Sequence, residues 1–259
     1  MIKGALFDID DTLYFHKDRC VPELTLKLLD ELKQKGIKIG ICTSRLPAEM
    51  SSVPQELWDK VDCKIMGTGS TTMVERKYYK VYSIAKETLN KYMAYFKENN
   101  ISYCYSDVNG DLFFWGDLSL VLDGHILSWA KRKVMFKEFE DEEVSNIFYY
   151  LVTPKQEEYI KSINPDAIIS TWGDCGNISA SYVDKSFGVL KFCQIYGLTT
   201  DEVVAAGDGF NDDIMLEMAG IGIAVENAKD NTKKAANYIC HKSIEEGGLY
   251  EAFKDLKII

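Results

Sequence analysis

The chain lacks the cysteine patterns of a disulfide framework and of a structural zinc site. Its seven cysteines are an odd number, lie far apart, and include no Cys-x-x-Cys pair. We interpret most of them as small buried hydrophobic residues. Cys42 is the clearest example, because it ends the apolar run Ile39-Gly40-Ile41-Cys42. The cysteines therefore point to neither a disulfide-rich nor a zinc-dependent protein.

Long apolar runs and basic clusters are also absent. No stretch approaches the roughly 20 apolar residues that a membrane-spanning helix needs, and the N-terminal apolar run meets Asp8 too soon for a signal peptide. The 30 Lys and Arg residues against 40 Asp and Glu residues give a formal charge of −10, and Lys131-Arg132-Lys133 is the densest basic run. An acidic surface repels nucleic acid phosphates. We expect a cytoplasmic protein that binds neither nucleic acid nor membrane.

The remaining composition is that of an ordinary soluble protein. The 259 residues are 46% hydrophobic and 27% charged, enough for one large domain or two modest ones. The first segments alternate in type: an apolar strand over 2–7, a helix over 22–35 with leucines at helical spacing, and a strand over 37–42. Such a strand–helix–strand unit indicates a parallel sheet with helices on its faces.

The C-terminal third repeats this pattern, whereas the middle differs. We predict strands over 201–207, 221–225 and 238–240, with helices over 186–196 and 212–219. In the middle, aromatic-rich strands over 101–107 and 112–115 flank Asn109-Gly110, a strong hairpin signal. Further strands over 147–152, 167–171 and 178–183 accompany helices over 86–99, 126–134 and 156–162. The sequence thus predicts an α/β fold with an α+β unit inserted at about residues 80–183.

Polar residues follow several of the predicted apolar strands. Asp8 and Asp10 point the same way in an extended segment, because side chains alternate with a period of two. The other clusters are Thr43-Ser44, Lys185, and Gly207-Asp208-Gly209-Phe210-Asn211-Asp212-Asp213. Ligands of open α/β sheets bind beyond the carboxyl ends of the strands. Brought together there, these groups would supply a nucleophile, a second carboxylate, a hydroxyl, an ammonium group and oxygen ligands for Mg²⁺, as phosphoryl transfer requires.

Each of these groups also has an ordinary structural interpretation. The acidic stretch after the first strand resembles a turn capping a helix, and Lys185 alone would be a solvated lysine. Thr43 is typical of a helix cap, Asp208-Gly209 of a turn, and Asn211-Asp212 of an N-cap. Their combination at successive strand ends favours the catalytic interpretation.

The four clusters, in their order along the chain, resemble the four motifs of the haloacid dehalogenase superfamily. These are Asp8-x-Asp10-x-Thr12, Thr43, Lys185, and Gly207-Asp208-x-x-Asn211-Asp212. The insertion between the second and third motifs is similar to the cap of the Cof-type (type IIB) sugar-phosphatase branch. The resemblance implies a Rossmann-like catalytic core over 1–79 and 184–259. It also implies a substrate-selecting cap over 80–183.

The resemblance also implies a role for each motif residue. Asp8 would be the nucleophile and Asp10 the general acid and base, with Thr12 helping to position Asp10. The Mg²⁺ ion would be held by Asp8, Asp208 and the backbone carbonyl of Asp10, with Asp212 as support or as a further ligand. The phosphate oxygens would be bound by Thr43, Ser44, Lys185 and Asn211. The chain departs from the branch at Gly67-Thr68-Gly69-Ser70, where Asn-Gly is usual, and at Ser186, where Gly is usual.

Cap residues are expected to choose the substrate, because the core recognises phosphate and metal. The candidates are Tyr103, Tyr105, Phe113, Phe114, Trp115, Trp172 and Asn177, although aromatic strands in a small domain more often form its core. Arg45 has two interpretations, as a substrate contact or as a surface residue.

Our hypothesis is a Mg²⁺-dependent phosphatase that hydrolyses a small phosphorylated metabolite, such as a sugar phosphate, through an aspartyl-phosphate intermediate. A phosphomutase on the same core is the alternative within enzymes, and a phosphoacceptor signalling domain is the alternative from another class. A catalytically inactive binding protein has no support in the sequence, because every motif position holds a competent residue. We expect a monomer or a homodimer.

Overall fold

The larger of two structural units, called the core below, contains an eight-stranded sheet. The computed structural model describes residues 1–15, 17–75, 77–122 and 134–259. The strand order is β14-β13-β12-β1-β2-β3-β4-β5. Six strands pair in parallel: β1 (Gly4–Phe7), β2 (Lys38–Cys42), β3 (Cys63–Met66), β12 (Val203–Gly207), β13 (Ile221–Ala224) and β14 (Tyr238–Ile239). β4 (Thr71–Val74) and β5 (Lys77–Val81) extend the edge antiparallel. β1 lies between β12 and β2, so Asp8 emerges in the middle of the sheet.

Helices cover both faces of this sheet. α1 (Glu23–Gln34) and α9 (Gly248–Asp255) pack on one face, where the leucines of α1 meet Phe7 and Phe253. α6 (Lys185–Tyr196) and α7 (Asp213–Met218) pack on the other, through Phe192 and Leu216. The short helices α2 (Gln55–Trp58) and α8 (Asp230–Ala235) complete the core. A Cβ at Gly40 would lie 2.7 Å from the Phe192 ring, so glycine there lets α6 lie close to the strands.

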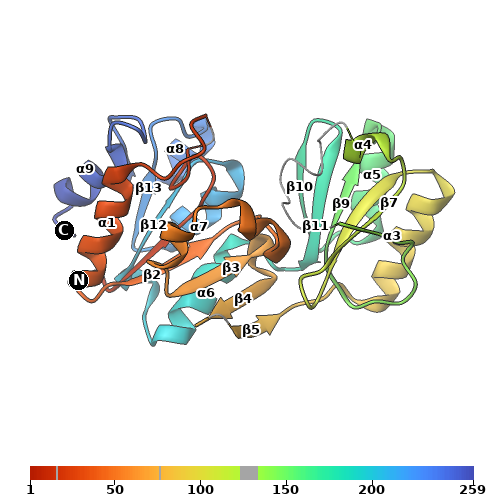
Figure 1. Cartoon of the computed structure of the whole chain (residues 1–259), viewed down its shortest axis with the longest axis horizontal. Helices are drawn as coiled ribbons and strands as arrows, with labels where there is room; N and C mark the ends of the chain where they lie inside the picture. Colours follow the sequence, from red (N-terminus) through yellow and green to blue (C-terminus); the bar gives the residue numbers. More distant parts are fainter. Residues whose placement is uncertain (16, 76, 123–133) are drawn as a thin grey trace.

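The inserted unit, called the cap below, has its own six-stranded sheet of order β10-β11-β9-β6-β7-β8. The strands are β6 (Ser102–Asp107), β7 (Leu112–Trp115), β8 (Met135–Phe136), β9 (Val144–Tyr150), β10 (Ala167–Trp172) and β11 (Cys175–Ser181). α3 (Lys86–Glu98) and α5 (Pro154–Ile163) pack on one face, and α4 (Ser119–Leu122) follows β7. Figure 1 shows the cap, in yellow through green to turquoise, beside the core.

The other face of the cap sheet meets the core. Leu46 and Ala48, from the segment that follows β2, are buried against Cys104, Leu112 and Phe114 of the cap. The segment continues as a 3₁₀ turn over Pro47–Ser52. The residues that come directly after Thr43 and Ser44 therefore pack against the cap.

The prediction of a parallel-sheet α/β core with an inserted α+β cap is confirmed. Most predicted elements form with shifts at their ends; the strand predicted over 147–152, for example, is β9 at Val144–Tyr150. The antiparallel β4–β5 edge and α9 are additional to the prediction. β5 ends at Val81, two residues past the boundary predicted at 79, and the division between core and cap stays a prediction. The helix predicted over 126–134 lies, apart from its last residue, outside the described residues.

Five cysteines, Cys42, Cys63, Cys104, Cys193 and Cys240, are buried, as expected for small hydrophobic residues. A search of the described residues finds no helix with the length and apolar character needed to cross a membrane.

Candidate active site

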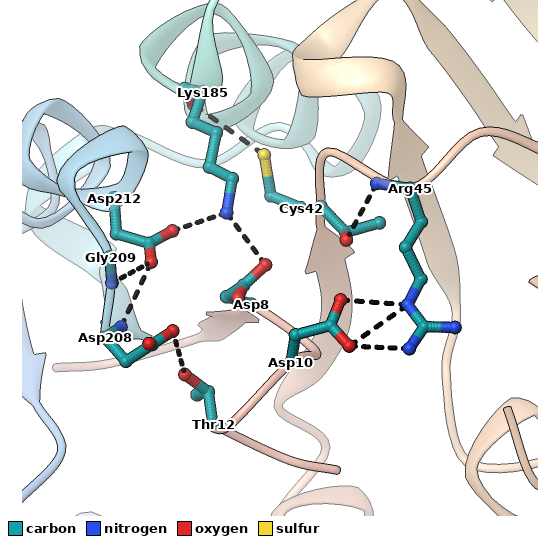
Figure 2. A network of polar contacts seen from close by, with 10 residues as sticks. Asp8, Asp10, Thr12, Cys42, Arg45, Lys185, Asp208, Gly209 and Asp212 are labelled. Carbon is teal, nitrogen blue, oxygen red and sulfur yellow. Dashed lines mark hydrogen bonds and ion pairs between the residues drawn. The ribbon is translucent and has the colours of Figure 1, made fainter. Parts of the chain in front are cut away.

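The site forms where three central strands end and one helix begins (Figure 2). Asp8 follows β1, Thr43 follows β2, Asp208 follows β12, and Lys185 is the first residue of α6. The Asp184 carboxylate caps α6 by accepting hydrogen bonds from the backbone N–H groups of Ser186 (2.9 Å) and Phe187 (3.2 Å). This cap fixes the first turn of α6 and with it the position of Lys185.

Lys185 lies between two carboxylates. Its Nζ donates to Asp8 Oδ1 at 2.8 Å and to Asp212 Oδ1 at 2.5 Å, and the side chain is fully buried. Burial lowers the pKa of Lys185, but the Asp212 and Asp8 carboxylates outweigh it, so the net shift is upward. Lys185 is therefore an ammonium group whose charge is directed at the predicted nucleophile.

Three carboxylates converge beside this ammonium group. Oxygen atoms of Asp8, Asp208 and Asp212 all lie within 4.8 Å of one another. Burial raises the pKa of Asp8 well above its usual range, against the opposing effect of Lys185. Burial, and then the Asp212 charge, raise the pKa of Asp208 to about 7. Three hard oxygen donors facing a single ammonium group form a donor set that fits a divalent cation such as Mg²⁺.

Asp212 also holds the loop that carries Asp208. Its Oδ2 accepts from the backbone N–H groups of Asp208 at 3.0 Å and Gly209 at 2.9 Å. A Cβ at Gly207 would lie 2.4 Å from the Asp212 carboxyl carbon, so this close approach requires glycine. With Oδ1 on Lys185, both oxygens of Asp212 have partners inside the protein.

Asp10 lies apart from the three converging carboxylates and is bound by Arg45. The guanidinium donates from Nε to Asp10 Oδ2 at 2.8 Å and from Nη2 to Oδ1 at 2.6 Å. Arg45 is buried, and its Nη1 also donates to Ser52 Oγ at 2.5 Å. The interpretation of Arg45 as a surface residue was wrong, because its side chain is buried and its guanidinium is paired with the Asp10 carboxylate. Arg45 comes directly after Thr43-Ser44 at the end of β2, and this position in the sequence could have indicated that it belongs to the site.

The other predicted site residues lie around these groups. The Thr12 hydroxyl is 3.5 Å from Asp208 Oδ1, which places it beside the predicted metal ligand. Thr43 is buried and its Oγ1 accepts from the Arg45 N–H at 3.2 Å, while Ser44 next to it is half-buried. Asn211 is half-buried in the turn before α7. Phosphate binding by Thr43, Ser44, Lys185 and Asn211 stays a prediction, as does the action of Thr12 on Asp10.

The cap candidates separate into two groups. Tyr103 packs on Trp115 (5.4 Å between ring centroids) and Tyr105 on Phe113 (5.0 Å), within or beside the core of the cap. Phe114 is buried in the cluster around Leu46, and the Trp172 side chain lies outside what the structure describes. Asn177 differs, because it is buried on the face that meets the core and contacts Asn146, which in turn contacts Gly67.

Comparison with known proteins agrees with this architecture. The model of the haloacid dehalogenase-like hydrolase family matches residues 5–253. The 5-amino-6-(5-phospho-D-ribitylamino)uracil phosphatase YcsE of Bacillus subtilis is 24% identical over 95% of this chain and 92% of its own length. Among solved structures, the HAD subclass IIB sugar phosphatase BT4131 superposes with a TM-score of 0.87 at 24% identity, covering 99% of this chain and all of that one.

A second solved structure, of the phosphatase BT1666 from Bacteroides thetaiotaomicron, has a TM-score of 0.85 at 23% identity. It covers 100% of this chain and 96% of that one. At this level of sequence identity the structural likeness establishes the fold alone. The match of the family model over most of the chain establishes the family to which the chain belongs. The resemblance inferred from the four motifs is thus confirmed, and the chain belongs to the haloacid dehalogenase-like hydrolase family.

Proposed function

We propose that this protein is a phosphatase that hydrolyses a small phosphomonoester through a phosphoryl group carried on Asp8. The observation that carries the proposal is the buried Lys185 ammonium, which holds Asp8 and Asp212 at 2.8 and 2.5 Å beside Asp208. A carboxylate that attacks a phosphate dianion needs nearby positive charge to offset the repulsion. The relative YcsE and the solved structure BT4131 are phosphatases by name, which supports the same chemistry here.

In the first step a carboxylate oxygen of Asp8 forms a bond to phosphorus while the bond from phosphorus to the ester oxygen breaks. Asp10 gives its proton to the departing alcohol oxygen. In the second step Asp10 takes a proton from water, whose oxygen attacks phosphorus and releases phosphate, so that both carboxyl groups return to their starting states. Arg45 grips both oxygens of Asp10 and thereby fixes the direction in which that carboxyl group faces.

Asp8 and Asp208 are the side chains that we propose to hold Mg²⁺, together with the backbone carbonyl of Asp10. When bound, Mg²⁺ supplies positive charge that reduces the repulsion between Asp8 and the phosphoryl oxygens. Asp212 has a supporting role in this proposal, because its two oxygens already accept from Lys185 and from the N–H groups of Asp208 and Gly209. Lys185 neutralises charge on the side of Asp8 that faces α6.

Hydrolysis of p-nitrophenyl phosphate, measured with Mg²⁺ and with a chelator, tests the proposal. We expect turnover that needs the metal and falls by at least about 10³-fold in Asp8→Asn, which is nearly isosteric but is not a nucleophile. Asp11→Asn is the matched control, because Asp11 is a variable position between Asp10 and Thr12 to which no role is assigned, and its φ of 53° is one that asparagine tolerates. Full activity in Asp8→Asn would contradict the mechanism.

The same assay separates the alternatives. Transfer of the phosphoryl group to a second hydroxyl without free phosphate would indicate a phosphomutase. A long-lived phosphoryl group on Asp8 without turnover would indicate a phosphoacceptor domain.

A further inference from the structure

The Arg45 guanidinium is held along one edge, over one face and at its third nitrogen. Its edge donates from Nε and Nη2 to the two oxygens of Asp10 (Figure 2). The Tyr14 ring lies over its face, with 5.7 Å between Cζ and the ring centroid. The third nitrogen, Nη1, donates to Ser52 Oγ at 2.5 Å. Asp10 and Tyr14 both lie in the segment after β1, so Ser52 is the contact that comes from the segment after β2.

The backbone of Arg45 is anchored, but its side chain needs a further contact. The Arg45 N–H donates to Thr43 Oγ1 at 3.2 Å, and the Arg45 carbonyl accepts from the Gly67 N–H at 2.8 Å. These bonds fix the point from which the side chain starts. An arginine side chain has large rotamer freedom of its own, so the position of the guanidinium depends on the groups that its nitrogens bind.

The Ser52 hydroxyl is oriented to accept from Arg45. Its Oγ donates to the Glu49 carbonyl oxygen at 2.7 Å, and a carbonyl oxygen can only accept. The one hydroxyl hydrogen is therefore used, and the lone pairs of Oγ remain for the Arg45 N–H group. Ser52 is half-buried, which limits the competition of water for the same lone pairs.

A short turn brings Ser52 back to Arg45. In the 3₁₀ turn over Pro47–Ser52, Glu49 Oε2 accepts from the Leu46 N–H at 2.7 Å. Leu46 is also fully buried against the cap. Packing against the cap and hydrogen bonds within the turn thus give Ser52 a defined position relative to Arg45.

The group that accepts from Nη1 is uncharged, which matters for the ion pair. A carboxylate in this position would compete with Asp10 for the charge of Arg45. A hydroxyl group accepts the hydrogen bond without adding a negative charge, so the attraction between Arg45 and Asp10 is kept. Glu49, the carboxylate of the same turn, accepts from the Leu46 N–H instead.

We propose that Ser52 is a positioning residue for proton transfer: its hydroxyl holds the Arg45 guanidinium, which in turn orients the Asp10 carboxyl group. This inference rests on the proposed phosphatase function, in which Asp10 gives a proton to the departing alcohol oxygen. If the guanidinium turns away, Asp10 loses its fixed direction and protonation of the leaving group slows. The effect is largest for an ester whose leaving group depends on that proton.

Turnover of propyl phosphate and of p-nitrophenyl phosphate tests the inference. We expect Ser52→Ala to lower kcat for propyl phosphate by about 10-fold, with KM within about 2-fold of the wild type. The loss for p-nitrophenyl phosphate should be less than about 3-fold, because its leaving group needs little help from a proton donor. Ser51→Ala is the matched control, because the exposed Ser51 hydroxyl also donates to the carbonyl three residues before it, at 3.3 Å. It should keep the wild-type values on both esters.

Two further variants separate positioning from a merely structural role. Ser52→Thr keeps the hydroxyl and should hold kcat for propyl phosphate within about 3-fold of the wild type. Adding Ser52→Ala to Arg45→Lys should cost less than about 2-fold more, because residues that act through one contact are not additive. Thermal unfolding of each variant shows whether it is folded. Equal losses on both esters in Ser52→Ala, or no loss, would overturn the inference, as would multiplied losses in the double variant.

Exchange of arginine side-chain N–H protons with water provides a readout that does not need turnover. It can be followed by NMR on protein that carries isotope-labelled arginine, of which the chain has four residues. We expect the Arg45 protons to exchange at least about 10-fold faster in Ser52→Ala than in Ser51→Ala. Equal exchange rates would also overturn the inference. If the wild type hydrolyses neither ester, the proposed function fails, and the exchange rates still decide whether Ser52 holds Arg45.

Discussion

Asp8 and Lys185 form an ion pair in the interior of the protein, which is an expensive arrangement. Removing water from two charges costs several kcal/mol per ion, and apolar replacements of such pairs are often neutral or stabilising, whereas removal of one partner costs about 3–5 kcal/mol. Stability alone therefore does not account for the pair. Its position at the end of the central strand, beside Asp208 and Asp212, agrees with the role that we propose for it in the reaction.

Arg45 has a role that its residue type defines closely. Its planar guanidinium binds both oxygens of Asp10 in a two-point contact, which a lysine ammonium cannot reproduce. We expect Arg45→Lys to lower kcat/KM by about 10-fold or more, because Asp10 would no longer be held in one orientation for proton transfer. The loss should be greater for an alkyl phosphate than for p-nitrophenyl phosphate, whose leaving group needs less help from a proton donor.

Steady-state kinetics on these two esters make the measurement. Arg19→Lys, at an exposed position of the same residue type, is the matched control and should leave both values unchanged. An equal loss on both esters would show that Arg45 acts on folding or substrate binding instead of on proton transfer.

At the scale of elements, the segment that follows β2 joins the site to the cap. Arg45 faces Asp10, Leu46 is buried against the cap, and Glu49 lies in the 3₁₀ turn that follows. Glu49 is half-buried, and its Oε2 accepts from the Leu46 N–H at 2.7 Å. After burial itself, its charge raises the pKa of the Cys104 thiol in the cap. The carboxyl group of Glu49 therefore lies in the contact between core and cap.

Glu49 should make stability depend on pH. Burial raises its pKa to about 7 from a usual value near 4.5, although the Leu46 N–H and Arg45 act in the opposite direction. A raised carboxyl pKa means that the folded state binds the proton more tightly than the unfolded state does. The stabilisation that comes from protonating Glu49 is therefore complete below about pH 4.5. That contribution is lost as the pH rises through about 7. We expect Glu49→Gln to gain about 1–2 kcal/mol over the wild type between pH 5 and pH 8, after allowance for solvent screening.

Chemical denaturation of both proteins at the two pH values measures this difference. Glu98→Gln, an exposed change at the end of α3, should show no such trend. A wild type that becomes more stable relative to Glu49→Gln as the pH rises would show that Glu49 is held by the Arg45 charge instead of being penalised by burial.

At the scale of the whole molecule, the cap and the core meet through an apolar contact around Leu46 and a polar one at the Gly67–Ser70 loop. Leu46 belongs to the core chain but is fully buried among cap residues. Leu46→Ala should cost about 2–5 kcal/mol if the site cannot collapse. Because the lost contact joins the two units, we also expect them to separate more often.

Small-angle X-ray scattering measures that separation as a larger radius of gyration in Leu46→Ala. Leu89→Ala removes a buried leucine of α3 from within the cap and is the matched control. It should lower stability by a similar amount without a change in radius. An unchanged radius in Leu46→Ala would mean that other contacts hold the cap in place.

Much of this protein could be predicted from the sequence because its signals are local. Leucine spacing predicted α1, apolar runs predicted the central strands, and Asn109-Gly110 predicted the β6–β7 hairpin. The topology rule that ligands bind beyond the ends of parallel strands brought Asp8, Lys185 and Asp208 to one site in advance. An apolar run that stops at an acidic residue marks the end of a strand, and this pattern can be recognised in the sequence alone.

Tertiary structure decided the partners of the side chains. Arg45 binds Asp10, Asp212 holds Lys185 and the Asp208 loop, and Asn146 joins the cap to Gly67, across sequence separations of 35, 27 and 79 residues. No local pattern encodes such pairs, because they depend on how Leu46 packs and where the cap sheet comes to lie. The sequence by itself determined the strand ends and the reactive groups they carry. The tertiary packing decided which of those side chains are held and oriented by hydrogen bonds and ion pairs.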